Sequence, residues 1–237
     1  MKISVCLATY NGAQYIKAQL DSILCQLGDD DEVVVSDDSS TDNTVSIIRQ
    51  FNDNRIKIYT DNQFKSPILN FEYAISKATG KYIFLSDQDD EWAPNKIAIL
   101  LPLLNKKMLV ASHFTFIDQH SNPINKIIRN QPSKSFLCNF IKPTIPGCCM
   151  AFTCELKEKI LPFPNGIAMH DWWITLIAGV HTQIVVTTEP LTLIRRHETN
   201  YSSTGSKSNY SLWQKIGMRY FILKKLLLYL RQSKQNQ

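Results

Sequence analysis

Three carboxylates follow one short apolar run in the segment KYIFLSDQDDEW, at residues 81–92. The run at 82–85 is β-branched and aromatic, which predicts a buried strand that ends just before Asp87, Asp89 and Asp90. These acids repel one another, and no basic residue stands among them in the sequence. A bound Mg²⁺ or Mn²⁺ would relieve the repulsion, because both ions prefer oxygen ligands. The alternative interpretation is a solvated acidic turn before a helix that begins near Pro94.

Two further loops are candidates for binding a nucleotide. Residues 8–12 (ATYNG) follow a predicted strand at 3–8, and residues 36–40 (SDDSS) follow another at 32–36. In doubly wound sheets, ligands lie at the carboxyl ends of the strands, where loop N–H groups meet a base or phosphate. An aspartate in the second loop can accept a hydrogen bond from N3–H of uracil or thymine. Asp37 and Asp38 also suit the dipole of the following helix, and we assign Asp37 to that role.

Other ligand classes lack their sequence patterns. Neither loop carries the glycine spacing of a dinucleotide site or a Walker loop, so NAD and ATP are not indicated. No basic–aromatic RNA signature or helix-turn-helix pattern is evident either. We therefore expect no nucleic-acid partner.

Strands alternate with helices through the first ninety residues, which predicts an α/β fold with a parallel sheet and helices on both faces. The pattern changes after Pro94 without a linker, so we expect one continuous fold. The expected strands are 3–8, 32–36, 55–59, 81–86, 108–117, 148–153, 182–187 and 190–196. The expected helices include 67–78, 95–104, 170–179 and 212–231, with an irregular stretch at 118–146.

The composition fits one large domain, or one domain with a small appendage. The chain has 237 residues, of which 44% are hydrophobic and 20% charged, and this excludes a disordered chain. Its six cysteines show no CxxC spacing, which favours buried thiols in a reducing cytosol over disulfides or zinc. We expect no signal peptide and no membrane span, since no window reaches about 18 uninterrupted apolar residues.

Basic residues gather near the C-terminus, where residues 213–237 contain no acid. This asymmetry suggests an anionic surface partner. The basic positions scatter around the expected helix instead of forming one polar face, so it is not a clean interfacial helix. Two interpretations remain open: a partly buried terminal helix, and a helix that docks on a membrane surface or a partner.

The ordered segments ISVCLATYNG, EVVVSDDSSTDNT and NFEYAISKATGKYIFLSDQDDEW resemble the family 2 glycosyltransferases, which have the GT-A fold. The last segment is similar to bacterial rhamnosyl- and hexosyltransferases of surface polysaccharide synthesis. The resemblance implies a Rossmann-like, mixed and mostly parallel sheet flanked by helices. It covers residues 1–200, with a nucleotide-binding half at 1–92 and an acceptor half at 93–200. Residues 201–237 would form a basic helical C-terminal extension.

The resemblance also implies roles for the donor-side residues. Asp87 and Asp89 match the DxD motif, which holds a divalent metal, Mn²⁺ or Mg²⁺, on the donor diphosphate. His197 matches a histidine that joins the metal or the diphosphate, and its alternative is a surface histidine in a basic loop. The remaining nucleotide-binding candidates lie in the two loops and are Thr9, Tyr10, Asn11 and Asp38, with Asp38 at the base.

On the acceptor side, Asp171 matches the catalytic base, and its alternative role is to cap a helix. The residue before it is His170 where the family usually shows Glu, which weakens any role assigned to that Glu. Gly147 and Cys148 match the loop beside the sugar pocket. Trp172 is a candidate to stack on a sugar, with core packing as the alternative for it and for its neighbour.

We therefore expect an inverting, metal-dependent glycosyltransferase that uses a UDP- or dTDP-sugar. Its acceptor would be a glycan or lipid-linked oligosaccharide of bacterial surface polysaccharide synthesis (O-antigen, lipooligosaccharide or capsule). We expect a cytoplasmic protein, peripheral on the cytoplasmic face of the inner membrane. One alternative, a sugar-nucleotidyltransferase, needs a glycine- and arginine-rich loop that ATYNGAQY lacks. The other, a non-catalytic nucleotide-sugar-binding subunit, is disfavoured because Asp87, Asp89, Asp171 and His197 are all present.

Overall fold

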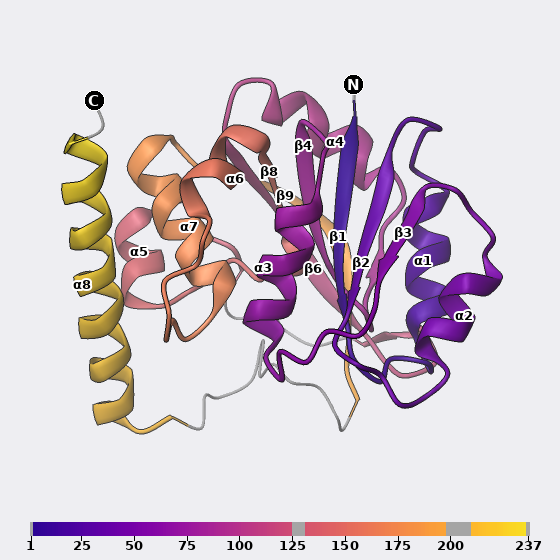
Figure 1. The fold of residues 1–237 in the computed structure, drawn as a ribbon. Coiled ribbons are helices and arrows are strands. Elements are labelled where there is room, and N and C mark those ends of the chain that lie inside the picture. The colour runs from indigo at the N-terminus through magenta and orange to yellow at the C-terminus, as the bar shows by residue number, and fades with distance from the viewer. Residues whose placement is uncertain (1, 125–130, 198–209, 236–237) are drawn as a thin grey trace.

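A mixed sheet forms the centre of the computed structural model, which describes residues 2–124, 131–197 and 210–235 (Figure 1). Within these ranges, nine strands pair in the order β3-β2-β1-β4-β8-β6-β9-β5, with β7 added beside β6. The first four strands are parallel, as predicted. They are β1 (Ile3–Thr9), β2 (Glu32–Asp37), β3 (Ile56–Tyr59) and β4 (Tyr82–Asp87).

The second half of the sheet is mixed. β8 is antiparallel to both β4 and β6, whereas β9 is parallel to β6. The two strands expected at 182–187 and 190–196 are a single strand, β9, whose register against β6 shifts beside His113. Pro190 has no N–H to donate there, and the shift accommodates it. These strands are β5 (Glu91–Trp92), β6 (Leu109–Ile117), β7 (Pro123–Ile124), β8 (Met150–Thr153) and β9 (Val185–Arg195).

Helices cover both faces of the sheet, and two of them were not expected from the sequence. α5 and α6 are six and seven residues long, too short for a helical period to show. The strand expected from residue 148 begins instead as a 3-10 turn, η1 (Gly147–Cys149). The helices are α1 (Ile16–Leu24), α2 (Thr44–Gln50), α3 (Pro67–Lys77), α4 (Lys96–Leu104), α5 (Phe136–Ile141), α6 (Cys154–Ile160), α7 (His170–His181) and α8 (Leu212–Gln235).

Alternate side chains along the strands build two apolar layers. Val5 and Leu7 of β1 face the layer of α1, α2 and α4, while Cys6 and Ala8 face that of α3, α6, α7 and α8. Burial on both faces explains why the parallel strands read as continuous apolar runs. The packing fixes the carboxyl ends of β1, β2 and β4 at one edge of the molecule.

The terminal helix α8 lies along the side of the molecule, next to α7 (Figure 1). Ile222 and Leu226 are buried in the layer that α7 shares, so the helix is partly buried. Residues 198–209, where the predicted domain meets the predicted extension, lie outside the described residues. None of the helices in the described ranges combines the length and apolar character needed to cross a bilayer.

Candidate functional site

The carboxyl ends of β1, β2 and β4 bring the three predicted loops together. Thr9 pairs in register with Asp37, and Ala8 pairs with Asp87. Asn70, from α3, donates through Nδ2 to the Thr9 carbonyl oxygen at 3.1 Å. The nucleotide-binding candidates and the acidic segment therefore share one edge of the sheet.

Gln88 ties the acidic segment to the first loop. The Tyr10 N–H donates to Gln88 Oε1 at 2.8 Å, and Gln88 Nε2 donates to the Tyr10 carbonyl at 3.0 Å. A Cβ added to Gly12 would collide with the Gln88 amide, so glycine leaves the room for this contact. The Tyr10 side chain itself stays exposed. Sequence reasoning missed Gln88 because the motif draws attention to the acids on either side of it.

The two aspartates of the second loop accept hydrogen bonds from different parts of the chain. The Asp37 carboxylate accepts from Thr9 Oγ1 and from the Ser40 N–H, each at 2.8 Å. Asp37 therefore has a structural role, because its hydrogen bonds to Thr9 and Ser40 hold the loop together. An interaction with the helix dipole alone would not need these partners. Asp38 Oδ1 accepts from the Phe64 N–H at 2.6 Å.

Asn11 fastens the first loop to the second. Its N–H donates to Ser40 Oγ and its Oδ1 accepts from the Thr41 N–H, both at 2.8 Å. Its φ of 48° lies in the left-handed region, which asparagine tolerates better than most residues. The two loops thus form one bonded unit beside the acidic segment.

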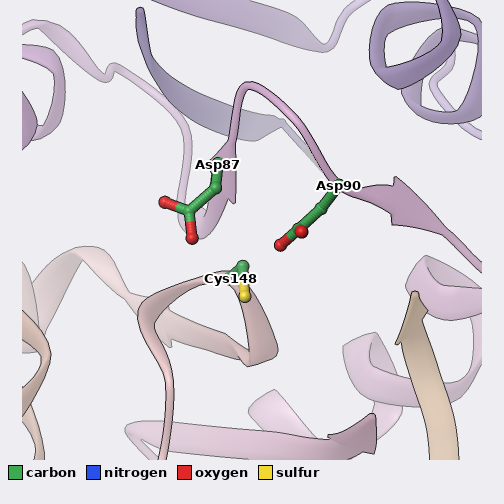
Figure 2. A group of neighbouring side chains, drawn as sticks. All are labelled: Asp87, Asp90 and Cys148. Atoms are coloured by element: carbon green, nitrogen blue, oxygen red, sulfur yellow. The ribbon is translucent and has the colours of Figure 1, made fainter. Parts of the chain in front are cut away.

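Asp87, Asp90 and Cys148 point toward one another (Figure 2). One ligand atom from each lies within 4.8 Å of the other two. Burial raises the pKa of Asp87 to about 7, and the charges of Asp89 and Asp171 add to this. Burial, together with the charges of Asp89 and Asp87, also raises the pKa of Asp90 well above its ordinary value. Asp90 was expected among these acids from the sequence, whereas Cys148 was expected beside the sugar pocket and not beside them.

Asp89 lies next to His197, the other residue assigned to a metal. His197 Nε2 is 2.8 Å from Asp89 Oδ2, and the imidazole packs against the Tyr15 ring with centroids 4.8 Å apart. The end of β9 therefore brings His197 to the acidic segment. The metal-binding role of the pair stays a prediction.

Basic side chains flank the acids, although none stands among them in the sequence. Lys96 is fully buried and donates to the Cys148 carbonyl at 2.7 Å and to Thr192 Oγ1 at 2.8 Å. The Arg195 N–H donates to Asp90 Oδ1 at 3.0 Å, and its Nε donates to the Asp89 carbonyl at 2.9 Å. Lys96, six positions after Asp90 in the sequence, and Arg195 at the end of β9 therefore lie beside the acidic segment, yet the pKa values of Asp87 and Asp90 remain raised.

Asp171 lies in the first turn of α7 and contacts η1. Its Oδ1 accepts from the Trp172 N–H at 2.6 Å, and the Gly147 N–H bonds to the same carboxylate. Burial raises the pKa of Asp171 to about 6 against these bonds. Turn η1 thus contacts Asp171 through Gly147 and the acidic cluster through Cys148.

His170 fills the space between α3 and η1. Its ring stacks on Phe71 at a centroid distance of 4.3 Å, and a Cβ on Gly147 would lie 2.8 Å from its Nε2. Neither ring nitrogen has a hydrogen-bond partner among the described residues. Burial lowers the pKa of His170 to about 3, so the imidazole is neutral at pH 7 and a weak base.

Trp172 and Trp173 pack in the core. They are 3% and 2% exposed, and their indole N–H groups donate to the carbonyls of Asn139 and Ile160. The proposal that Trp172 stacks on a sugar gives way to core packing, because neither indole presents a face to a ligand.

Comparison with known families identifies this arrangement. The family described as "Glycosyl transferase family 2" matches residues 4–161, which include both loops, the acidic segment and η1. The chain belongs to glycosyltransferase family 2. The resemblance inferred from the sequence is therefore confirmed.

Several relatives of this family 2 chain are bacterial proteins named as sugar transferases. The dTDP-rhamnosyl transferase RfbG of Shigella flexneri is 30% identical over 211 residues, which cover 82% of this chain and 72% of RfbG. The Escherichia coli enzyme WfgD, named UDP-Glc:alpha-D-GlcNAc-diphosphoundecaprenol beta-1,3-glucosyltransferase, is 33% identical over 68% of this chain and 62% of its own. An uncharacterized Nostoc glycosyltransferase is 31% identical, with 68% of this chain and 54% of the relative covered. The chain thus spans about half the length of some curated relatives.

Solved structures confirm the GT-A architecture. Residues 1–349 of Staphylococcus aureus TarS, in complex with UDP-GlcNAc, match with a TM-score of 0.73 at 20% identity, over 96% of this chain and 67% of that one. The Pyrobaculum calidifontis mannosyltransferase PcManGT, in complex with GDP-Man and Mn²⁺, matches with a TM-score of 0.66 at 24% identity, over 84% and 58%. At these identities the likeness establishes the fold of this glycosyltransferase.

Proposed function

We propose that this protein transfers a sugar from a nucleotide-diphosphate donor to an acceptor hydroxyl, with inversion at the anomeric carbon. One observation carries the proposal: a single turn, η1, joins Asp171 on one side to the acidic end of β4 on the other. A base and a diphosphate-binding group must lie on opposite sides of the reacting carbon for an in-line displacement. The contacts of η1 with both groups support this arrangement.

A pyrimidine nucleotide is the donor that we favour. The two bonded loops present Asp38 and the exposed Tyr10 beside the end of β1, where a base would lie. Two relatives are named for dTDP-rhamnosyl transfer and for UDP-Glc. We extend this preference to the present chain and assign Thr9, Tyr10, Asn11 and Asp38 to the nucleoside.

The acidic segment fits a divalent cation. Carboxylates are hard ligands, and Asp90 Oδ2 is buried without a hydrogen-bond partner among the described residues. Asp87, Asp89 and His197 would hold the ion next to the donor diphosphate, with Asp90 adjacent. When bound, Mn²⁺ or Mg²⁺ neutralises the charge that builds on the leaving diphosphate.

Asp171 acts as the general base in this proposal. As the acceptor oxygen bonds to the anomeric carbon, its proton passes to the Asp171 carboxylate and the sugar–phosphate bond breaks. The nucleoside diphosphate leaves on the side of the acidic segment. One displacement inverts the configuration, so no covalent intermediate with the protein forms.

We assign the acceptor to bacterial surface polysaccharide synthesis, as a glycan or lipid-linked oligosaccharide. WfgD is named for an acceptor on diphosphoundecaprenol, and TuaG of Bacillus subtilis is named for teichuronic acid biosynthesis. By extension, the present protein works on the cytoplasmic face of the inner membrane. The sugar transferred is a hexose or a deoxyhexose such as rhamnose.

A screen of nucleotide sugars tests the proposal. UDP- and dTDP-sugars should raise the melting temperature more with Mn²⁺ than without it, since a ligand of the native state stabilises it. Donors that bind are then incubated with lipid-linked acceptors, and release of nucleoside diphosphate is measured. If donors bind but none of the donor–acceptor pairs releases nucleoside diphosphate, the result would favour the non-catalytic subunit and overturn the enzymatic proposal.

A further inference from the structure

The outward face of α8 carries an apolar stripe that the domain does not cover. Its members recur every three or four residues, so they lie on one side of the helix. Each is between 39% and 80% exposed. The stripe consists of Leu212, Ile216, Tyr220, Leu223 and Leu227, with Trp213 beside the first turn.

The opposite face of α8 holds the helix on the domain. Ile222 and Leu226 are buried there, and Tyr229 Oη contacts His181 Nε2 at 2.5 Å. The helix therefore has two apolar faces, one for its own core and one turned outward. This explains why its basic residues scatter around the axis, a pattern that the sequence analysis took as evidence against an interfacial helix.

Helix α5 extends the outward stripe. Leu137 and Ile141 are 65% and 55% exposed, and the Ile141 carbonyl accepts from Arg219 Nε of α8 at 2.7 Å. The two helices lie side by side (Figure 1). We call the stripe together with these side chains the α5–α8 surface.

The exposed charges carried by α5 and α8 themselves are basic, whereas the acids near α8, Glu72 and Glu158, line the cavity beside Lys225 and Tyr229. The sequence contains no acidic residue after Glu198, and Lys224 and Arg231 are exposed on α8. Lys134 and Lys142 are exposed at the two ends of α5. Two copies of this surface would bring like charges together, whereas an anionic bilayer pairs them with headgroups and receives the apolar side chains.

We propose that the α5–α8 surface docks this protein on an anionic phospholipid bilayer. The biological purpose rests on the proposed function, because a lipid-linked acceptor is confined to a membrane. The first turn of α8 lies toward the same end of the molecule as the carboxyl ends of β1, β2 and β4 (Figure 1). Docking would therefore hold the donor-side loops near the membrane surface.

Trp213 reports on docking without labelling. It is 80% exposed, whereas the other three tryptophans, Trp92, Trp172 and Trp173, are at most 3% exposed. Vesicles rich in phosphatidylglycerol should shift its emission to shorter wavelength at low salt, and brominated lipid should quench it. Vesicles of phosphatidylcholine alone, or high salt with anionic vesicles, should weaken binding strongly. A folded protein whose Trp213 emission ignores anionic vesicles at low salt would overturn the proposal.

Matched variants test whether the α5–α8 surface is specific, or whether any exposed basic or apolar residue contributes equally to vesicle binding. Lys224→Gln with Arg231→Gln should lower partitioning about 25-fold, from about five-fold per charge near an anionic surface. Lys17→Gln with Lys106→Gln, which removes two exposed charges elsewhere, should leave it unchanged. Leu212→Gln with Tyr220→Gln should lower it about ten-fold, and Leu69→Gln, exposed on α3, should not. Equal losses in the test and control variants would contradict a specific surface.

Two other outcomes are distinguishable. A blue shift of Trp213 that grows with protein concentration in the absence of lipid, together with dimers in sedimentation, would assign the surface to a second copy and overturn the proposal. Donor binding and turnover with a detergent-solubilised acceptor test the proposed function separately. Turnover without vesicle binding removes only the docking inference, and vesicle binding without turnover removes only the proposed reaction.

Discussion

His197 Nε2 lies 2.8 Å from Asp89 Oδ2, although 108 positions separate the two residues. β9 makes this contact, because it runs parallel to β6 and ends beside the acidic segment. Arg195, at the end of β9, bonds to the Asp89 carbonyl and fixes the approach of the strand. The contact joins His197, two residues after the end of β9, to the acidic motif at the end of β4.

Asp89→Ala should abolish turnover and remove the metal-dependent part of the stabilisation by UDP or dTDP. His197→Ala should also lower the metal-dependent stabilisation. The double variant should lose less stabilisation than the sum of the two single variants, because the two side chains are in contact. Asp21→Ala, an exposed acid on α1, is the control. Thermal shift with and without Mn²⁺ measures the effect. Wild-type activity of Asp89→Ala in Mn²⁺ would refute the metal assignment.

Asp171→Asn should lower kcat by about 10²–10⁴, the range for general-base assistance, and leave nucleotide and metal affinity nearly unchanged. The capping alternative predicts a lower melting temperature with a modest kinetic loss. Both quantities are measured on one sample. A variant that melts early but turns over normally would transfer the base role elsewhere. His170, whose pKa is lowered to about 3 by burial, would be a poor replacement.

Asp38→Ala should weaken binding of UDP and dTDP, because it removes the carboxylate assigned to the base. It also removes the bond to the Phe64 N–H, so the melting temperature of the free protein is measured alongside. Titration calorimetry with UDP, dTDP and GDP gives the affinities. Tighter binding of GDP than of both pyrimidine nucleotides to the wild type would contradict the assignment.

Glu32 should make stability depend on acid pH. Burial opposes its ionisation, but hydrogen bonds from Lys57, Ser4 and Thr79 outweigh it and lower the pKa to about 2, against 4.5 for a free group. The unfolded chain therefore binds the proton first, and this contribution to the free energy of unfolding is lost as pH falls from about 4.5 toward 2.

Urea unfolding of Glu32→Gln at pH 7, 4 and 3 tests this prediction. The variant should be less stable than the wild type at pH 7, and the difference should shrink at the lower pH values. Glu189→Gln, an exposed acid on β9, should show no such trend. If the stability difference between the variant and the wild type stays constant with pH, the destabilisation by Glu32→Gln would be due to packing alone.

Two glycines should respond oppositely to alanine. At Gly80 a Cβ would lie 2.7 Å from the Ser4 backbone nitrogen, so Gly80→Ala forces the backbone apart and should cost about 1–3 kcal/mol. At Gly217, in α8, a Cβ meets nothing within 4 Å, and alanine should add up to about 1 kcal/mol of helix stability. Urea unfolding of both variants measures the two effects, and destabilisation by Gly217→Ala would contradict an open helical position at Gly217.

The parallel half of the fold was predictable because its signals are local. Each strand is a continuous apolar run, and polar loops at their ends share one edge by topology alone. The order of β8, β6 and β9 was not predictable, since antiparallel insertion of β8 depends on contacts between residues 82 and 153. α5 and α6 lack enough turns to show a period.

The acids of the site were visible in the sequence, but their surroundings were not. Asp90 and Cys148 come together because η1 packs against β4 in the folded chain. Lys96 is only six positions from Asp90, but the sequence does not reveal that its side chain is buried against η1. No spacing rule connects Arg195 to the acids. The burial of Trp172 depended on packing around α7, which a pair of adjacent aromatic letters does not reveal.

Lys96 gives the turn η1 a buried internal partner. Its ammonium group is sealed over the Trp92 ring, 4.4 Å from the centroid, and bonded to the backbone of η1. A turn that a buried side chain of α4 holds in place does not need a ligand to keep its position. We therefore expect η1 to stay where it is between successive catalytic cycles, when no nucleotide is bound.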